Sequence, residues 1–409
     1  MQNMTPGQLR MLIKRMQQIR NVLPACCRMP LQEGMLAEAQ HNWLENALHV
    51  LLAPYQTMGA CVAIAYQNRL LTVISQGDAI AHESVVTPQT RFRVASISKL
   101  IATLGLLQLV DSGALSLDDD VSTSLGFLVG NPRFPYACIT LRQLLTHTAG
   151  VRDDHDYDRF AGTERMPKLS ALFDTAKAAR RNFFPFAPGT RFAYSNLGAG
   201  MTGAMLEAVT GMELDAYLQK NIFQPLAMDA SFHPQRIVGP MASCYRMPKQ
   251  SLSYDTRRIA QVALPDHTDP MMHYTTYPGK LMICAGDLLR LLLALCQDGC
   301  VEGTRILSSQ MVREMITPQN QRGSVHCDID RGLHVAIAPE IFAPNRTLLG
   351  HQGMAYGAIC EAWCDPTDGS GVVLLTNGAL PRKCGPVACV GQDIVAACYL
   401  ALDTWRTCH

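Results

Sequence analysis

The chain has 409 residues, of which 48% are hydrophobic and 17% are charged, with 35 basic and 34 acidic side chains. This hydrophobicity and a net charge of +1 exclude an intrinsically disordered chain, and they argue against a nucleic-acid-binding protein, which would need a basic surface. The length fits two structural units, or one large domain that carries an insertion. No apolar run reaches the ~18 residues of a membrane span, so no transmembrane segment is predicted.

The fifteen cysteines and the N-terminal segment bear on the cellular compartment. The cysteine count is odd and many cysteines lie in apolar segments, which favours small buried side chains in a reducing compartment. Residues 1–45 are interpreted as a basic amphipathic helix, capped by Thr5, and a linker. They lack the continuous apolar run of a secretory signal, so a cytoplasmic protein is expected. The basic helix leaves targeting to an organelle or a membrane surface open.

Strand-like segments lie in two groups at opposite ends of the chain. Residues 59–66 and 70–76 predict two strands, and the polar residues 67–69 between them predict a hairpin turn. An isolated hairpin is marginally stable in water, so these strands should join a larger sheet. Further strands are predicted near the C-terminus over residues 333–338, 357–363 and 371–376.

The segment between the two groups has a different character. Residues 113–285 are dominated by helical patterns and proline-rich loops, and a last helix is expected from about 390 to 402. We therefore predict an α+β fold, with an antiparallel sheet flanked by helices. Residues 46–112 and 286–409 would form this α/β domain from both chain ends, and residues 113–285 would be a large, mainly helical insertion.

A Ser-x-x-Lys pair stands at the start of a strongly apolar predicted helix. The helix is apolar nearly all round up to Gly113 and should therefore be buried, with Ser96 and Lys99 in its first turn. Residues i and i+3 share one helix face, so the lysine can reach the serine hydroxyl, and burial favours a neutral, basic lysine. Such a neighbour makes the hydroxyl a nucleophile, and the amides of a helix N-terminus suit an oxyanion. Alone, the pair also fits a serine cap and a surface lysine.

Two further motifs could contribute to a site. Residues 194–196 (Tyr-Ser-Asn) lie in a loop before a predicted helix; a tyrosine near a lysine can transfer protons, and asparagine offers a donor and an acceptor. Residues 350–354 (Gly-His-Gln-Gly-Met) are expected to enter the strand at 357–363, and glycines at a strand edge let a ligand approach the backbone. Each of these motifs is common by itself, so only their combination carries weight.

Together the three motifs resemble those of the serine beta-lactamase-related family, which includes class C beta-lactamases, D-alanyl-D-alanine carboxypeptidases and family VIII esterases. The resemblance covers roughly residues 55–405 and extends to segments outside the motifs, at 87–92, 139–150 and 224–228. The family's Ser-x-x-Lys matches Ser96 and Lys99, its Tyr-x-Asn matches Tyr194 and Asn196, and its third motif matches His351, Gln352 and Gly353.

The resemblance implies a beta-lactamase/transpeptidase-like fold and a serine hydrolase that uses neither a metal nor another cofactor. It implies that Ser96 attacks a carbonyl and carries the acyl group, while Lys99 and Tyr194 pass the serine proton to the leaving group. The substrate would be a small ester, amide or peptide. The implied substrate-binding residues are Asn196, His351 and Gly353, and the implied oxyanion hole consists of the backbone amides of Ser96 and Met354.

His351 stands where typical class C beta-lactamases carry a lysine that helps to hold the substrate carboxylate. Histidine is only partly charged near neutral pH, so the resemblance favours an esterase or a D-amino-acid peptidase or carboxypeptidase over efficient beta-lactam hydrolysis. A beta-lactamase or penicillin-binding DD-peptidase is the alternative if the protein is exported. A non-catalytic scaffold or binding protein that retains the fold is an alternative of another class. The sequence assigns neither the substrate nor the oligomeric state.

Two other patterns are interpreted as structural. Residues 198–203 fit Gly-x-Gly-x-x-Gly but follow a loop instead of a strand, so the glycines are expected to allow close helix packing and not to bind a dinucleotide. The acidic segment from His147 to Asp158 has no recognised metal-ligand spacing and is interpreted as a solvated loop. A metallohydrolase that uses this segment is a third hypothesis.

Overall fold

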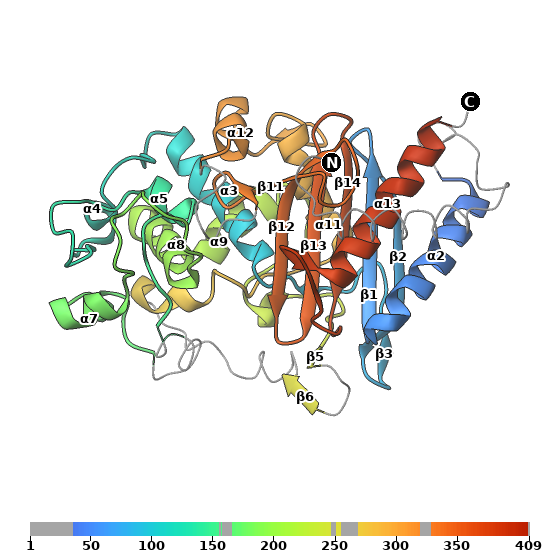
Figure 1. Cartoon of the computed structure of the whole chain (residues 1–409), viewed down its shortest axis with the longest axis horizontal. Coiled ribbons are helices and arrows are strands. Elements are labelled where there is room, and N and C mark those ends of the chain that lie inside the picture. The colour runs from blue at the N-terminus through green and yellow to red at the C-terminus, as the bar shows by residue number, and fades with distance from the viewer. Residues whose placement is uncertain are drawn as a thin grey trace.

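An eight-stranded antiparallel sheet forms the centre of the molecule in the computed structural model, which describes residues 36–154, 157, 166–246, 251–254, 269–319 and 329–407 (Figure 1). The strand order is β10-β11-β12-β13-β14-β1-β2-β3. Because β1 pairs with β14, the sheet joins the two ends of the chain, which confirms the predicted α+β architecture. The strands are β1 (Gly59–Tyr66), β2 (Arg69–Ile80), β3 (Ser84–Val85), β10 (Asp330–Arg331), β11 (Ala336–Pro339), β12 (Thr347–Ala355), β13 (Ala358–Asp365) and β14 (Ser370–Thr376).

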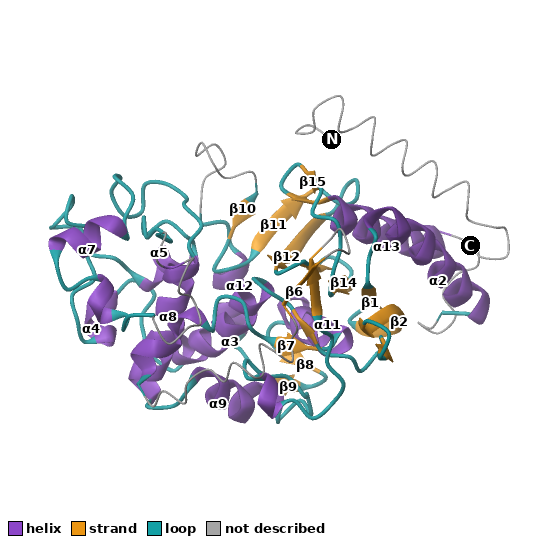
Figure 2. Ribbon diagram, turned by 90° about the horizontal axis from the view of Figure 1, so that it is seen from below, coloured by secondary structure: helices purple, strands orange, loops and turns teal. Residues whose placement is uncertain are grey.

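Helices cover both faces of this sheet, which is why every residue of β13 and β14 is buried. Helices α2 (Glu38–Leu52) and α13 (Cys389–Thr407) lie side by side over one face (Figure 2). Helices α3 (Ile97–Asp111) and α11 (Ala285–Leu293) pack on the other face. Successive side chains of a strand point to opposite faces, so β1 contributes alternate residues to two separate hydrophobic cores.

The remaining elements lie mainly on the side of the sheet that carries α3 (Figure 1). The helices are α4 (Val121–Leu125), α5 (Leu141–Leu145), α7 (Ala176–Arg181), α8 (Asn196–Thr210), α9 (Leu214–Leu218) and α12 (Ser309–Ile316). Short strands form four small pairs: β4 (Phe92–Arg93) with β7 (Met282–Ile283), β5 (Cys244–Arg246) with β6 (Ser251–Tyr254), β8 (Cys300–Val301) with β9 (Thr304–Arg305), and β15 (Lys383–Cys384) with β16 (Val387–Ala388).

Two predicted strand boundaries are corrected by the backbone. The β1–β2 turn has two residues, Gln67 and Asn68, both with positive φ, so β2 begins one residue earlier than expected. The strand expected over 333–338 begins only at β11, because His334 has a φ of 51° and interrupts the extended backbone.

The motif at 350–354 lies within a strand of its own, β12, and not at the entry to the strand at 357–363. Strand β12 forms a hairpin with β13 through Tyr356 and Gly357, which both have positive φ. The glycines at 350 and 353 weakened the strand pattern, because glycine is depleted in strands. The sequence therefore predicted one strand too few here.

Helix α2 bears on the predicted division at residue 45. It runs without a break across that position, and its Trp43 packs edge-on against Trp405 of α13 at 6.4 Å between ring centroids. Residues 38–45 therefore pack with the sheet and its helices. The predicted basic helix lies outside the described residues, and the division into an α/β domain and a helical insertion stays a prediction.

The glycines of α8 confirm the packing interpretation of the Gly-x-Gly-x-x-Gly pattern. A Cβ atom on Gly200 would lie 1.9 Å from the Tyr274 carbonyl oxygen, and one on Gly203 would lie 2.0 Å from the Tyr277 ring. Only glycine therefore lets α8 approach the short 3₁₀ helix η6 (Pro270–Thr275) and the residues that follow it.

The cysteines agree with the sequence interpretation in part. The described thiols include six that are buried, at positions 61, 244, 284, 360, 364 and 398. Cys384 and Cys389, however, form a disulfide between β15 and the start of α13, which the interpretation as buried apolar side chains did not predict. Across the described ranges, none of the helices has both the length and the apolar character needed to cross a membrane.

Candidate active site

Ser96 stands at the corner between β4 and α3. Ala95, directly before it, has a φ of 48°, a left-handed conformation that is uncommon for a residue with a side chain and that often occurs at functional sites. The turn is fixed by Ser98, whose Oγ donates to the Ala95 carbonyl at 2.6 Å. The Ser96 amide donates to no acceptor in the described part of the chain, so it is available to a ligand.

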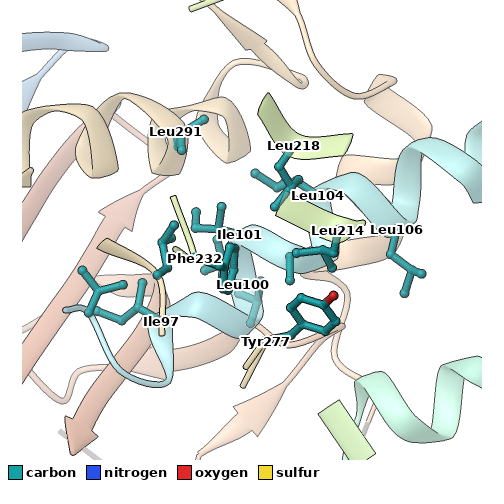
Figure 3. Close-up of a cluster of buried hydrophobic side chains, with 14 of the residues drawn as sticks. Ile97, Leu100, Ile101, Leu104, Leu106, Leu214, Leu218, Phe232, Tyr277 and Leu291 are labelled. Carbon is teal, nitrogen blue, oxygen red and sulfur yellow. The ribbon is translucent and has the colours of Figure 1, made fainter. Parts of the chain in front are cut away.

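Helix α3 is held rigidly behind this corner. It is apolar on nearly all sides, as predicted, and twelve of its fifteen residues are buried. Neighbouring elements surround it with apolar side chains (Figure 3). The residues labelled in that view are Ile97, Leu100, Ile101, Leu104 and Leu106 of α3, Leu214 and Leu218 of α9, Leu291 of α11, and Phe232 and Tyr277.

Lys99 lies one turn into α3 and is only 1% exposed. Its Nζ is 3.2 Å from Ser96 Oγ, 2.9 Å from Asn196 Oδ1 and 2.8 Å from the Pro278 carbonyl oxygen. As an ammonium it has three protons for these three acceptors. The predicted Ser-x-x-Lys pair is therefore in contact, and the structure does not support the alternative of a surface lysine.

Asn196 begins α8 and accepts directly from Lys99, and a carboxylate on its other side fixes its side chain. Asp153 accepts from the Asn196 amide at 2.9 Å and from Asn196 Nδ2 at 2.8 Å. It also accepts from Ser195 Oγ and from the Leu197 amide, each at 2.8 Å. With Nδ2 committed to Asp153, the Oδ1 atom of Asn196 must face Lys99.

Tyr194 lies beside Lys99 at the solvent-exposed edge of these side chains. Its ring centroid is 5.0 Å from Lys99 Nζ and 4.3 Å from the ring of His147, and its side chain is 36% exposed. Tyr194 therefore borders both the buried lysine and the solvent. Its position is compatible with the predicted role in proton transfer.

Strand β12 runs along the segment that precedes Ser96. A Cβ on Gly353 would lie 2.1 Å from the Val94 carbonyl oxygen, so only glycine permits this approach. The approach brings the next residue, Met354, beside the Ser96 corner, with 44% of its side chain exposed. The contribution of the Met354 amide to an oxyanion hole stays a prediction.

His351, from the same strand, is buried and its Nδ1 donates to the Gln352 carbonyl oxygen at 2.6 Å. Burial, with the nearby charges of Arg331 and Lys99, lowers its pKa to about 3. The expectation of a partly charged histidine near neutral pH is therefore wrong, because the ring is desolvated. Its Nε2 is buried and has no hydrogen-bond partner among the described residues.

Known proteins share the sequence pattern of this chain over most of its length. The beta-lactamase family profile matches residues 44–388, which is most of the chain. The chain belongs to the beta-lactamase family. Penicillin-binding protein 4 of Amycolatopsis lactamdurans is 26% identical over 284 residues, which cover 66% of this chain and 67% of that protein. Other curated relatives are matched over less than half of their own length.

Solved structures show the same beta-lactamase/transpeptidase-like fold, as the resemblance implied. The D-amino acid amidase from Ochrobactrum anthropi SV3, in complex with L-phenylalanine amide, matches with a TM-score of 0.66 and 19% identity, covering 88% of this chain and 98% of that one. EstCE1, a hydrolase with promiscuous acyltransferase activity, matches with a TM-score of 0.66 and 23% identity, covering 87% and 98% respectively.

Two residues of this family member's site were missed by the sequence interpretation. Asp153 was assigned to a solvated loop, whereas it accepts four hydrogen bonds at the start of α8. His334 carried no signal; it is buried beside His147, with 4.9 Å between ring centroids, and its Nδ1 contacts Thr103 Oγ1 at 2.9 Å. Burial lowers the pKa of both His147 and His334.

The acidic segment shows no arrangement of metal ligands within the ranges that the structure describes. His147 is buried and accepts from the Ser195 amide through Nδ1. Asp154 pairs with Arg181 at 3.3 Å. Residues 155, 156 and 158 of the predicted segment lie outside the described residues.

Proposed function

We propose that this chain is a serine hydrolase that cleaves an ester or amide bond of a small acyl or peptide-like substrate through an acyl-enzyme on Ser96. The observation that carries the proposal is the contact of the buried Lys99 Nζ with Ser96 Oγ at 3.2 Å, at the N-terminus of a rigidly packed helix. Family membership and relatives named as an amidase, a hydrolase and a penicillin-binding protein support it.

The proton path follows from the contacts of Lys99. In its neutral form, Lys99 keeps its hydrogen bonds to Asn196 and Pro278 and turns its lone pair toward Ser96 Oγ. The serine then attacks the substrate carbonyl as its proton moves to the lysine. Tyr194, between the lysine and the solvent, passes the proton to the leaving group.

The proposed reaction also requires groups that stabilise the oxyanion and a step that releases the acyl group. The Ser96 amide, which donates to no acceptor among the described residues, and the Met354 amide donate to the developing oxyanion; such donors stabilise the transition state by several kcal/mol. Water, or another acceptor, then attacks the acyl-enzyme. The neutral His351 cannot supply charge, so we favour an esterase or D-amino-acid peptidase or carboxypeptidase type over a beta-lactamase.

A covalent label tests the proposal. Purified protein is incubated with a fluorophosphonate or a penicillin, and the mass increase is mapped to a residue by mass spectrometry. We expect labelling at Ser96, none in Ser96→Ala, and normal labelling in the control Ser112→Ala, which changes an exposed serine at the far end of α3. Folded protein that takes up neither reagent would favour a non-catalytic scaffold instead.

A substrate panel then separates the subclasses. It contains p-nitrophenyl esters, D-amino-acid amides and nitrocefin, and efficient nitrocefin hydrolysis would favour the beta-lactamase alternative. A cytoplasmic location belongs to the same proposal, and the Cys384–Cys389 disulfide weighs against it.

A further inference from the structure

Two cationic side chains beside the nucleophile have no acidic partner among the described residues. Arg93, on β4, is 7% exposed; its Nε donates to the Gly279 carbonyl at 2.8 Å and its guanidinium lies 4.2 Å from the centroid of the Tyr356 ring. Lys280 is partly buried next to it. In the part of the chain that the structure describes, neither side chain contacts a carboxylate.

Arg93 differs in this respect from Arg346, an arginine that is buried to the same extent. Arg346 is also 7% exposed, but it is paired with Asp365, Asp368 and Asp403. Burying an unpaired charge is costly, so a buried cation normally has a counter-charge. Burial and the charge of Arg93 lower the pKa of Lys280 to about 7. An anion placed between the two cations would remove this repulsion.

The pair adjoins the proposed catalytic group through the chain segment that carries Lys280. Two residues earlier, the Pro278 carbonyl accepts from Lys99 Nζ. The next residue, Gly279, lies against Ala95, directly before Ser96. A Cβ on Gly279 would meet no atom closer than 3.7 Å, so packing does not require glycine and its small size leaves room.

The other side of the pair is also linked to the site. Tyr356 follows Met354 by two residues in the β12–β13 hairpin and covers the Arg93 guanidinium. Arg93 is therefore linked both to the segment before Ser96, through Gly279, and to the β12–β13 hairpin, through Tyr356.

We propose that Arg93 and Lys280 form a subsite for a carboxylate of the substrate, so that the preferred ester or amide carries an acidic group. This inference rests on the proposed hydrolase function and names its substrate class. A carboxylate has two acceptor oxygens, which suit the N–H groups of the guanidinium and the ammonium that have no acceptor among the described residues. The neutral His351 offers no such charge.

Matched esters test the subsite. The ratio of kcat/KM for mono-p-nitrophenyl glutarate to that for p-nitrophenyl valerate compares an acidic and a neutral acyl chain of equal length. Removing one charge-assisted hydrogen bond should lower this ratio roughly 10- to 100-fold in Lys280→Met. Lys280→Arg should restore most of the ratio. The control Lys220→Met, on a different surface element, should leave it unchanged.

A binding measurement separates this inference from the proposed function. Glutarate is titrated calorimetrically into Ser96→Ala and into the double variant Ser96→Ala/Lys280→Met, with thermal unfolding as a check of folding. Glutarate binding that is lost in the double variant supports the subsite even if no ester is cleaved. Ester cleavage with the same acidic-to-neutral ratio in Lys280→Met, and glutarate binding that is equal in both variants, would overturn the subsite and leave the hydrolase standing.

Discussion

Replacing Asp153 by asparagine should lower activity through the side chain of Asn196. The carboxylate of Asp153 accepts four hydrogen bonds, from Ser195, Leu197 and both donors of Asn196. An asparagine keeps one acceptor oxygen, so two of the four donors lose their acceptor. Hydrogen bonds to charged groups contribute ~1.5–3 kcal/mol each, which gives a loss of about 3 kcal/mol or more in the free energy of unfolding.

The effect on activity comes from the freed amide. In the parent protein, Lys99 Nζ donates to Asn196 Oδ1 at 2.9 Å. Without the Asp153 carboxylate, the Asn196 side chain can rotate and turn Nδ2 toward Lys99 instead. The loss of that hydrogen bond to a charged group lowers kcat/KM roughly 10- to 100-fold. Asp153 is thus a positioning residue, because in the described structure it contacts the proposed catalytic lysine only through Asn196.

A double-mutant cycle tests this route. The kcat/KM values of the parent, Asp153→Asn, Asn196→Ala and the double variant are measured with one p-nitrophenyl ester. If Asp153 acts through Asn196, its substitution should have little further effect in the Asn196→Ala background. The control Asp154→Asn removes a carboxylate that pairs with Arg181 and should change kcat/KM less than twofold. Fully additive losses would refute the reasoning.

Three further outcomes are expected. Gly353→Ala should reduce esterase activity and lower the free energy of unfolding by about 1–3 kcal/mol, because the new Cβ would stand 2.1 Å from the Val94 carbonyl oxygen; rates and thermal unfolding check this. Lowering the pH from 7 to 5 should lower the free energy of unfolding, measured in urea. In the unfolded chain His351 binds a proton below a pKa of ~6.5, whereas in the folded protein it stays neutral down to a pKa of about 3. This difference alone lowers the free energy of unfolding by about 2 kcal/mol at pH 5. Reducing the Cys384–Cys389 disulfide should lower the free energy of unfolding by about 2 kcal/mol, measured in urea with and without a reductant.

Each of these outcomes has a matched control. Gly130 has open space around it and no positive φ, so Gly130→Ala should leave stability and activity nearly unchanged. His351→Gln should reduce the fall in stability between pH 7 and pH 5 by about 2 kcal/mol, and the buried His147 and His334 should account for part of the remainder; an unaltered fall would assign it to other groups. Cys384→Ala should show the full loss without a reductant, and a further loss on adding one would contradict the disulfide as its source.

The features that could be predicted from the sequence are those with a local pattern. The continuous apolar runs of β1 and β14, the apolar run of α3 and the Ser96–Lys99 spacing all depend on residues a few positions apart. Strand β12 was missed because its glycines serve a tertiary purpose. Gly353 is required only because Val94, far away in the sequence, lies beneath it.

The missed site residues share a dependence on tertiary contacts. Nothing local distinguishes Asp153 from its neighbour Asp154, although the first holds the start of α8 and the second pairs with Arg181. The partner of Asp153, Asn196, is 43 residues away. Lys280 likewise gains its importance from Arg93, which the β4–β7 pairing brings beside it. Such residues become visible only when the strands and helices are placed together.

The burial of His351 links the site to the proposed specificity. Its Nδ1 carries a proton that is donated to the Gln352 carbonyl, and protonating Nε2 would place a charge beside Lys99 in a desolvated position. The neutral form of His351 is therefore favoured near neutral pH, and it would hold a carboxylate less strongly than the lysine of typical class C enzymes does. A substrate carboxylate would have to find its counter-charge on another element. Arg93 on β4 and Lys280 on the segment before β7 provide that charge. The segment of Lys280 also contacts Lys99 and Ala95, so an acidic substrate would approach from the β4–β7 side of the nucleophile.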